Sequence, residues 1–255
     1  MKTFWQNKKS DVYIELYDDF AAYLKTKDEV NFFKKFFTKN QRIIEFGCGT
    51  GRTLIPLLEA GYKVEGLDIS SGMLKHLKQK LDKKSLKTRI HNEDLVRSSL
   101  KDKFDGGILS QRTLNFIADP DDQKKALMNI NKCLKKGAFL VINLMPARKD
   151  DFKSIQKRLK KNGEFKNSKT GNKVEFWGSW IPDPIKQTWD FVDEFREKNN
   201  KASTKMKMRV IFEMEMEGLL KKCGFETVDV YGSWGKDKYS AKSKDLIFVA
   251  KKERH

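Results

Sequence analysis

Residues 43–52 read Ile-Ile-Glu-Phe-Gly-Cys-Gly-Thr-Gly-Arg, an apolar run that passes into three alternate glycines, Gly47, Gly49 and Gly51. The run predicts a buried β-strand, and the glycines predict a turn into a following helix. Side chains are missing where strand becomes helix, so a ligand can approach the backbone closely. In a doubly wound α/β sheet this turn lies at the carboxyl ends of the strands, where ligands bind.

The turn alone fits more than one kind of site. A dinucleotide-binding turn carries a third glycine three residues after its second, and here that position is Arg52. The spacing therefore argues against a dinucleotide. A purely structural tight turn stays open as an alternative.

Strand and helix patterns alternate on both sides of this turn. The expected strands cover residues 42–46, 63–68, 88–92, 104–110 and 138–144, and the expected helices cover 52–60, 71–81 and 121–134. Such alternation predicts a parallel sheet with helices on both faces. Gly61 and Gly137 are expected to end two of these helices as left-handed C-caps.

Different patterns flank this core. Two helices are expected within residues 11–37, a basic helix from 146 to about 161, and antiparallel strands over 173–180, 185–195 and 205–212. A helix over 213–223 precedes strands 226–233 and 244–251, which a short loop joins, so they should form an antiparallel hairpin. The expected divisions are 1–40 as a helical cap, 41–145 as a nucleotide-binding core, 146–212 as a covering insertion and 213–255 as the end of the core.

Two acids are expected at the same edge of the sheet as the glycines. Asp68 ends the second strand, and its carboxylate can accept hydrogen bonds from both ribose hydroxyls, although an N-cap for the helix near Ser71 is the alternative. Asp94 follows the third strand and could accept the amine of adenine, with Ile69 and Leu95 enclosing the base. A solvated loop acid is the alternative for Asp94.

Together these features resemble the class I S-adenosylmethionine-dependent methyltransferase family, over about residues 42–144 and the closing hairpin. The resemblance implies a Rossmann-like sheet of seven strands, mostly parallel, and S-adenosylmethionine as the cofactor. It also implies that Glu45 orients the methionine amino group, that the glycines wrap methionine and ribose, and that Ser110 faces the sulfonium. The cofactor-binding residues expected on this basis are Glu45, Gly47, Cys48, Gly49, Gly51, Asp68, Ile69, Met73, Asp94, Leu95 and Ser110.

Catalytic residues are less marked. Methyl transfer is an in-line displacement that depends mainly on alignment in a dry site. Gln111 lies at the end of the fourth strand, and Tyr17 or Tyr13 could remove a proton from an amine acceptor; core packing is the alternative for both tyrosines. An Asn-Pro-Pro-aromatic motif, a Pro-Cys nucleophile and a metal-ligand cluster are missing from the sequence, so no metal is expected.

Aromatic residues of the insertion could cover an acceptor. One face of its strands could form an aromatic roof suited to an apolar or cationic acceptor, although packing or a dimer contact is the alternative. Tyr231 and Trp234 are weaker candidates from the closing region. The roof candidates are Phe176, Trp177, Trp180, Trp189 and Phe191.

The composition leaves several functions open. The formal net charge of +18 comes from 53 basic and 35 acidic residues, but scattered lysines on helix faces make a nucleic-acid partner the weaker interpretation. The three cysteines lack paired spacing, and no run of about 20 apolar residues predicts a membrane span, so we expect reduced thiols and a cytoplasmic monomer or homodimer. The expected function is methylation of a small molecule at nitrogen or oxygen, with RNA or ribosomal RNA methylation and non-catalytic binding of S-adenosylmethionine as alternatives.

Overall fold

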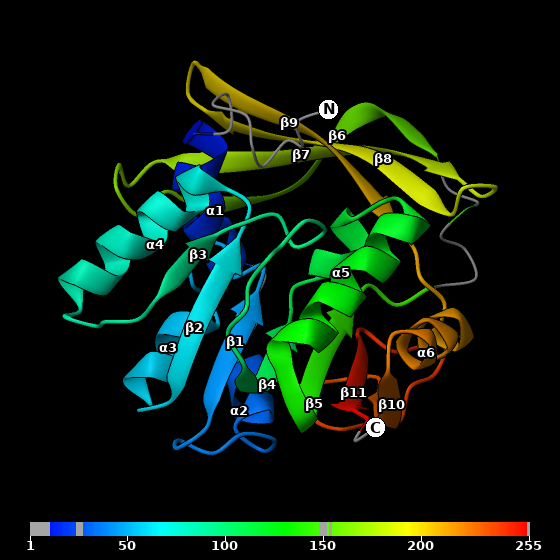
Figure 1. Cartoon of the computed structure of the whole chain (residues 1–255). Helices are drawn as coiled ribbons and strands as arrows, with labels where there is room; N and C mark the ends of the chain where they lie inside the picture. Colours follow the sequence, from blue (N-terminus) through cyan, green and yellow to red (C-terminus); the bar gives the residue numbers. More distant parts are fainter. Residues whose placement is uncertain (1–10, 24–27, 148–151, 153–154, 254–255) are drawn as a thin grey trace.

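Two separate sheets organise this chain, and the computed structural model describes residues 11–23, 28–147, 152 and 155–253 (Figure 1). The larger sheet has seven strands in the order β10-β11-β5-β4-β1-β2-β3. Its strands are β1 (Arg42–Phe46), β2 (Lys63–Asp68), β3 (Ile90–Asn92), β4 (Phe104–Leu109), β5 (Leu134–Leu144), β10 (Phe225–Tyr231) and β11 (Leu246–Lys252). The helices are α1 (Asp11–Tyr23), α2 (Asp28–Phe33), α3 (Leu54–Glu59), α4 (Ser71–Lys83), α5 (Pro120–Cys133) and α6 (Glu213–Lys222), with a short 3-10 helix η3 (Thr113–Phe116).

The pairing within this sheet confirms the fold predicted from the sequence. Strands β1 to β5 pair in parallel, whereas β11 runs antiparallel to both β5 and β10. The antiparallel closing hairpin is therefore confirmed. Parallel pairing places the carboxyl ends of β1, β2 and β4 side by side, which brings the glycine turn, Asp68 and Ser110 to one edge.

Apolar side chains cover the sheet on both faces. On one face Ile44 and Phe46 pack with residues of α5 and α6; on the other Ile43 and Val64 pack with residues of α2, α3 and α4. Alternate residues of one strand thus enter opposite layers, as a strand buried on both sides requires.

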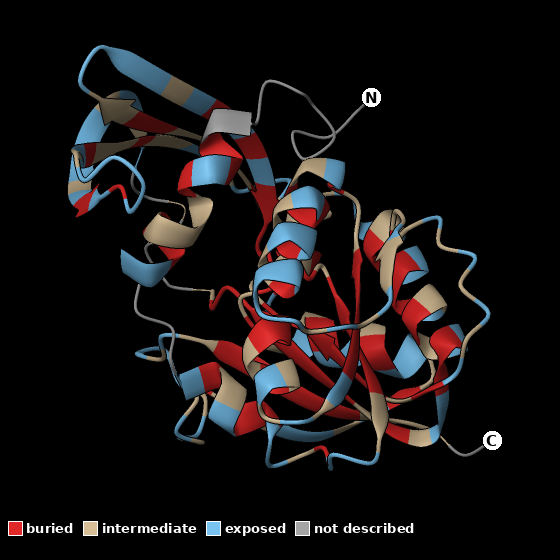
Figure 2. Cartoon of the chain, turned by 90° about the vertical axis from the view of Figure 1, so that its left-hand side faces the viewer, coloured by how far each residue is buried: buried red, intermediate tan, exposed pale blue. Residues whose placement is uncertain are grey.

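The second sheet is the expected antiparallel insertion, and we call it the roof sheet. It contains β6 (Gln156–Lys166), β7 (Lys173–Asp183), β8 (Thr188–Glu197) and β9 (Asn200–Arg209), in that order and all antiparallel. It lies across the carboxyl ends of the core strands, at the top of Figure 1. Figure 2 shows buried residues throughout the core and mixed burial in the roof sheet.

Two details of the prediction were wrong. The basic helix expected over residues 146–161 is not present, because residues 156–166 form edge strand β6, while 148–151 and 153–154 lie outside the described residues. Strand β6 pairs on one side only, and its many lysines are typical of an exposed edge. Gly137 does not end α5; the helix stops at Cys133, and Gly137, with φ of +76°, lies inside β5 near a register shift against β4.

Helix α1 lies between the roof sheet and the core. Tyr13 stacks on Phe195 of β8 with 4.9 Å between ring centroids, and Phe20 contacts Phe176 at 4.7 Å. Each such pair contributes about 0.5–1.5 kcal/mol beyond simple burial. The helices of the described residues include none that is both long and apolar enough to cross a membrane.

Candidate functional site

Gly49 is the glycine of the turn whose missing side chain leaves open space. Gly47, Gly49 and Gly51 have φ of +75°, +52° and +86°. A Cβ on Gly47 would collide with Thr113 and one on Gly51 with Leu77, whereas one on Gly49 would meet nothing within 4 Å. Packing therefore requires the outer two glycines, and Gly49 leaves room for a ligand against the backbone.

Asp68 ends β2 and holds this turn. Its Oδ2 accepts a hydrogen bond from the Gly49 N–H and its Oδ1 one from the Ser70 N–H, both at 2.8 Å. Burial raises the pKa of the Asp68 carboxyl, against the opposing effect of these backbone donors. The N-cap of α4 is Ser70, whose Oγ accepts from the Met73 N–H, so capping is not the role of Asp68.

Glu45 and Ser110 meet where β1 and β4 end. Ser110 Oγ donates a 2.9 Å hydrogen bond to Glu45 Oε1, and both residues are buried. Burial raises the pKa of Glu45 to about 8, while the bond from Ser110 opposes that shift. Among the described residues Glu45 Oε2 has no hydrogen-bond partner. A buried oxygen without a partner is costly, and it could accept from the amino group of a ligand.

Glu29 of α2 is a third acid at this site, and the sequence analysis missed it. The residue is only 1% exposed, accepts a hydrogen bond from Gln111 Nε2, and has its Oε1 3.3 Å from Arg52 Nε. Burial raises the pKa of Glu29 to about 7, with the charge of Arg52 opposing. Arg52 Nη2 is buried with no hydrogen-bond partner in the described part of the chain, so it could bind an anionic group.

Gln111 occupies strained backbone directly after Ser110. Gln111 and Arg112 follow one another with φ of +57° and +63°. A non-glycine residue in this region costs on the order of 1 kcal/mol, and such strain concentrates at functional sites. The structure brings Ser110 and Gln111 together with Glu45 and Glu29.

The remaining residues expected to bind the cofactor have local structural contacts. Asp94 Oδ1 accepts from the Val96 N–H at 3.0 Å, and Leu95 is buried in the core layer beside α5. The Ile69 carbonyl accepts from the Asn92 amide at 3.2 Å. Met73 and Cys48 are both buried. A role for these residues in binding the base stays a prediction.

Tyr13 and Tyr17 connect the glycine turn to the roof sheet. Their ring centroids are 6.2 Å apart. Burial raises the pKa of Tyr17, the charge of Arg52 opposes that shift, and the negative charge of Asp68 adds to it. The next residue of α1, Asp18, accepts a 2.6 Å hydrogen bond from Thr50 Oγ1 and so holds this part of the helix at the glycine turn. Tyr13 is buried against Phe195, so core packing accounts for one of its faces.

The aromatic residues of the roof sheet divide between its two faces. Strand alternation sends Trp180 and Trp189 to the inner face with Phe191, whose ring lies 6.3 Å from that of Phe116 in η3. Trp177 is on the outer face, where the Arg196 guanidinium lies 4.0 Å from its ring centre. Tyr231 and Trp234 pack on Phe32 of α2, away from the roof sheet.

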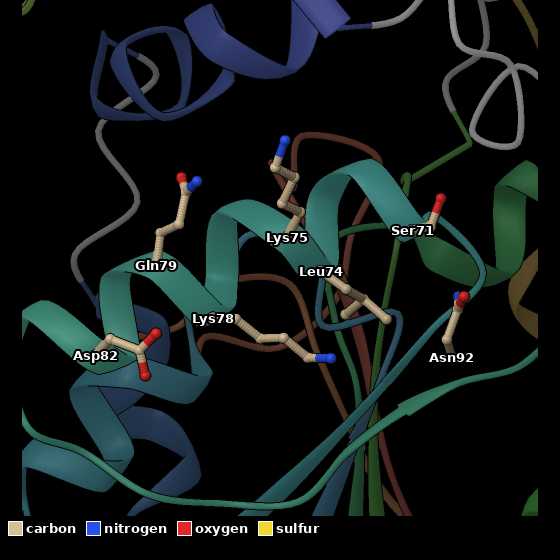
Figure 3. A pocket seen from close by; sticks show the side chains of 7 residues that line it. All are labelled: Ser71, Leu74, Lys75, Lys78, Gln79, Asp82 and Asn92. Carbon is tan, nitrogen blue, oxygen red and sulfur yellow. The ribbon is translucent and has the colours of Figure 1, made fainter.

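A hollow on the outer side of α4 is a separate feature (Figure 3). Ser71, Leu74, Lys78 and Asn92 are among the residues that line it, but Asp68 and the glycines of the turn are not. Figure 3 shows Lys75 and Lys78 among the lining residues, and both are exposed, as expected on a helix face that meets solvent.

The residues at the strand ends fit S-adenosylmethionine. The space beside Gly49 accommodates a ligand close to the backbone, and the unpartnered oxygen of Glu45 and the free donor of Arg52 match an amino group and a carboxylate. Asp68 retains acceptor capacity for hydroxyl groups beside that space. No group of three or more His, Cys, Asp or Glu residues that could hold a metal occurs in the described ranges.

Comparison with known proteins shows that this chain is similar to methyltransferases. Residues 43–137 match a family model described as a methyltransferase domain. The chain is 22% identical to "Putative methyltransferase YqeM" of Bacillus subtilis over 95% of this chain and 96% of that protein.

Solved structures share the whole fold. A S-adenosylmethionine-dependent methyltransferase from Clostridium acetobutylicum superimposes with a TM-score of 0.80 at 18% identity, covering 95% of this chain and 98% of that one. CalS10 of Micromonospora echinaspora, an amino pentose methyltransferase solved with S-adenosylmethionine bound, gives a TM-score of 0.71 at 16% identity, covering 93% and 96% of the two chains.

Proposed function

Because this chain is a class I S-adenosylmethionine-dependent methyltransferase, we propose that it methylates a nitrogen or oxygen atom of a small molecule held beneath the roof sheet. The observation that carries this proposal is the position of the roof sheet and α1 over the carboxyl ends of β1, β2 and β4 (Figure 1). A covered site favours a small acceptor over a large folded one. We also propose that the chain is divided into a cap (1–40), a cofactor-binding core (41–145), a covering insertion (146–212) and a closing part of the core (213–255).

Bound S-adenosylmethionine supplies an electrophilic methyl group on its sulfonium. The residues of this chain bind and align: Glu45 accepts from the methionine amino group, Arg52 donates to the carboxylate, and Asp68 accepts from the ribose hydroxyls. The roof sheet and α1 exclude water, which favours direct attack by the acceptor. We infer that the phenol oxygen of Tyr17 accepts a hydrogen bond from the acceptor; because burial raises the pKa of Tyr17, its hydroxyl keeps its proton and does not act as a base.

Nitrogen is the favoured acceptor atom. CalS10, which shares this fold over 93% of the chain, is described as an amino pentose methyltransferase. We propose the same class of acceptor atom for this chain. The cytoplasmic location also stays an expectation.

A direct test begins with calorimetric titration of the protein with S-adenosylmethionine and with S-adenosylhomocysteine. We expect both to bind with micromolar affinity. When S-adenosylmethionine is then mixed with the protein and small amines or phenols, we expect S-adenosylhomocysteine to be produced. Cofactor binding without turnover of any acceptor would favour a non-catalytic binding protein. Tight RNA binding that weakens steeply with salt would instead favour an RNA substrate.

A further inference from the structure

Asp193 lies on the inner face of the roof sheet, where its neighbours are apolar. In β8 the inner positions are Trp189, Phe191, Asp193 and Phe195, with the outer positions between them. The residues paired with Asp193 on that face are Gly178 of β7 and Thr204 of β9. An acid thus occupies a position where the alternation of the strand calls for a hydrophobic residue.

The Asp193 carboxylate has neither a hydrogen bond nor an ion pair within the described part of the chain. Burial alone raises the pKa of this carboxyl to about 7, and no neighbouring cation opposes it. Thr204 Oγ1, on the residue paired with Asp193, and Trp189 Nε1, further along the same face of β8, are buried without hydrogen-bond partners among the described residues. Because these polar atoms on the inner face of the roof sheet have no hydrogen-bond partners, a ligand could form hydrogen bonds with them.

The position opposite Asp193 on β7 is a glycine, Gly178. A Cβ on Gly178 would collide with Asn162 Nδ2 and would lie 3.8 Å from Asp193 Oδ1. Both polar side chains therefore lie over the same glycine. The absent side chain of Gly178 allows Asn162 and Asp193 to approach each other across the sheet.

The neighbours of Asp193 place it above the region where the acceptor must lie. Phe195, on one side, stacks on Tyr13 of α1, whose pKa is raised by burial and by the charge of Asp193. Phe191, on the other side, meets Phe116 of η3, which begins three residues after Ser110. Asp193 thus lies between the two elements that flank the glycine turn, α1 and η3.

We propose that Asp193 binds the ammonium group of the methyl acceptor, so that the acceptor is a small primary or secondary amine. An amine cation would pair with the otherwise unpaired carboxylate, and the neighbouring rings of Trp180, Trp189 and Phe191 would suit the positive charge and the apolar body of such a molecule. The step is recognition and includes no covalent change. This inference rests on the proposed function, since it concerns the acceptor of that same reaction.

Matched pairs of probes test it: benzylamine with benzyl alcohol, and cyclohexylamine with cyclohexanol. Binding to the protein saturated with S-adenosylhomocysteine is measured by calorimetry for wild type, Asp193→Asn and Asp190→Asn. Asp190 is the control, because it is an acid on the outer face of the same strand and pairs with Lys207. In wild type and in Asp190→Asn, we expect the amine of at least one pair to bind at least tenfold more tightly than its alcohol. In Asp193→Asn, we expect the amine and the alcohol of each pair to bind with similar affinity.

An unchanged amine preference in Asp193→Asn, equal affinity for both members of each pair, or no amine binding at millimolar concentration would each overturn the inference. Asp193→Asn should keep its affinity for S-adenosylhomocysteine, which verifies that the fold is intact. Turnover of each probe is measured separately. Methylation of alcohols or phenols without any amine binding would overturn the assignment of Asp193 and leave the proposed function standing, whereas failure of wild type to bind either cofactor form counts against the proposed function itself.

Discussion

Ser110 Oγ donates to Glu45 Oε1 across 2.9 Å and so ties together the ends of adjacent strands β4 and β1. This bond uses one oxygen of a carboxylate that is only 2% exposed, and the other oxygen has no partner among the described atoms. Ser110 thereby fixes the orientation of Glu45 and leaves its second oxygen unpaired. In the proposed cofactor site, this unpaired oxygen would accept a hydrogen bond from the amino group of the ligand.

Replacing Glu45 by glutamine should lower the affinity for the cofactor but raise the stability of the fold at high pH. Glu45→Gln should weaken binding of S-adenosylhomocysteine at least tenfold in calorimetry, because an acceptor of the ligand amino group becomes neutral. The pKa of Glu45 in the folded protein, about 8, exceeds its unfolded value of 4.5, so stability falls as pH rises from about 4.5 to about 8. The Gln variant lacks that loss and should be more stable than wild type at pH 9 by up to roughly 5 kcal/mol, but not at pH 4. Equal denaturation midpoints at pH 9 would contradict this.

Gly49→Val should abolish cofactor binding and leave the protein folded. The added side chain enters open space, and a β-branched residue at a φ of +52° costs roughly 1–3 kcal/mol, less than the stability of a typical domain. Gly51→Val is the contrast, because its side chain would collide with Leu77 in the core and should lower the melting temperature markedly. Thermal melting and calorimetry measure the two effects. If a folded Gly49→Val protein bound the cofactor with unchanged affinity, the cofactor site would not be at this turn.

Asp68→Asn should lower cofactor affinity by at least tenfold. An amide keeps one acceptor oxygen, so either the Gly49 N–H or the Ser70 N–H loses its partner, and the charge that attracts the ribose hydroxyls is gone. Asp94→Asn is the matched control; its side chain bonds within its own turn, and we expect a smaller loss. Titration with S-adenosylhomocysteine measures both. A larger loss for Asp94→Asn would reverse the assigned importance of the two acids.

Tyr17→Phe should lower kcat about tenfold or more with any acceptor that turns over, while affinity for S-adenosylhomocysteine changes less than about twofold. Removal of the hydroxyl leaves the ring in place between Tyr13 and the glycine turn. Tyr23→Phe, on the same helix but 42% exposed, should be neutral. Steady-state kinetics distinguish the roles: if Tyr17→Phe retains full kcat, the residue only packs.

The sequence was sufficient for the core because its signals are local. Strand β1 and the glycine turn are contiguous, and Asp68 ends a strand whose apolar pattern is plain. The roof sheet was predicted less well at β6, since residues 156–161 carry four basic side chains and no apolar alternation. An edge strand with few buried positions leaves no periodic pattern to detect.

The missed site residues depend on distant partners. Glu29 meets Gln111, which lies 82 residues later in the chain, and no local pattern marks that contact. Arg52 was considered only as a position that lacks glycine. Asp193 can be noticed in the sequence, because every second residue of this strand is aromatic, at Trp189, Phe191 and Phe195, except for the acid at position 193.

The position of α1 has a consequence for the order in which the protein forms. Asp19 of α1 accepts a hydrogen bond from the Ser168 N–H, 149 residues later, and Tyr13 stacks on the still later Phe195. Helix α1 therefore has these partners only after most of the chain is synthesised. Contacts of such long sequence separation slow folding, and until they form the apolar side of α1 is exposed to chaperones and to other nascent chains.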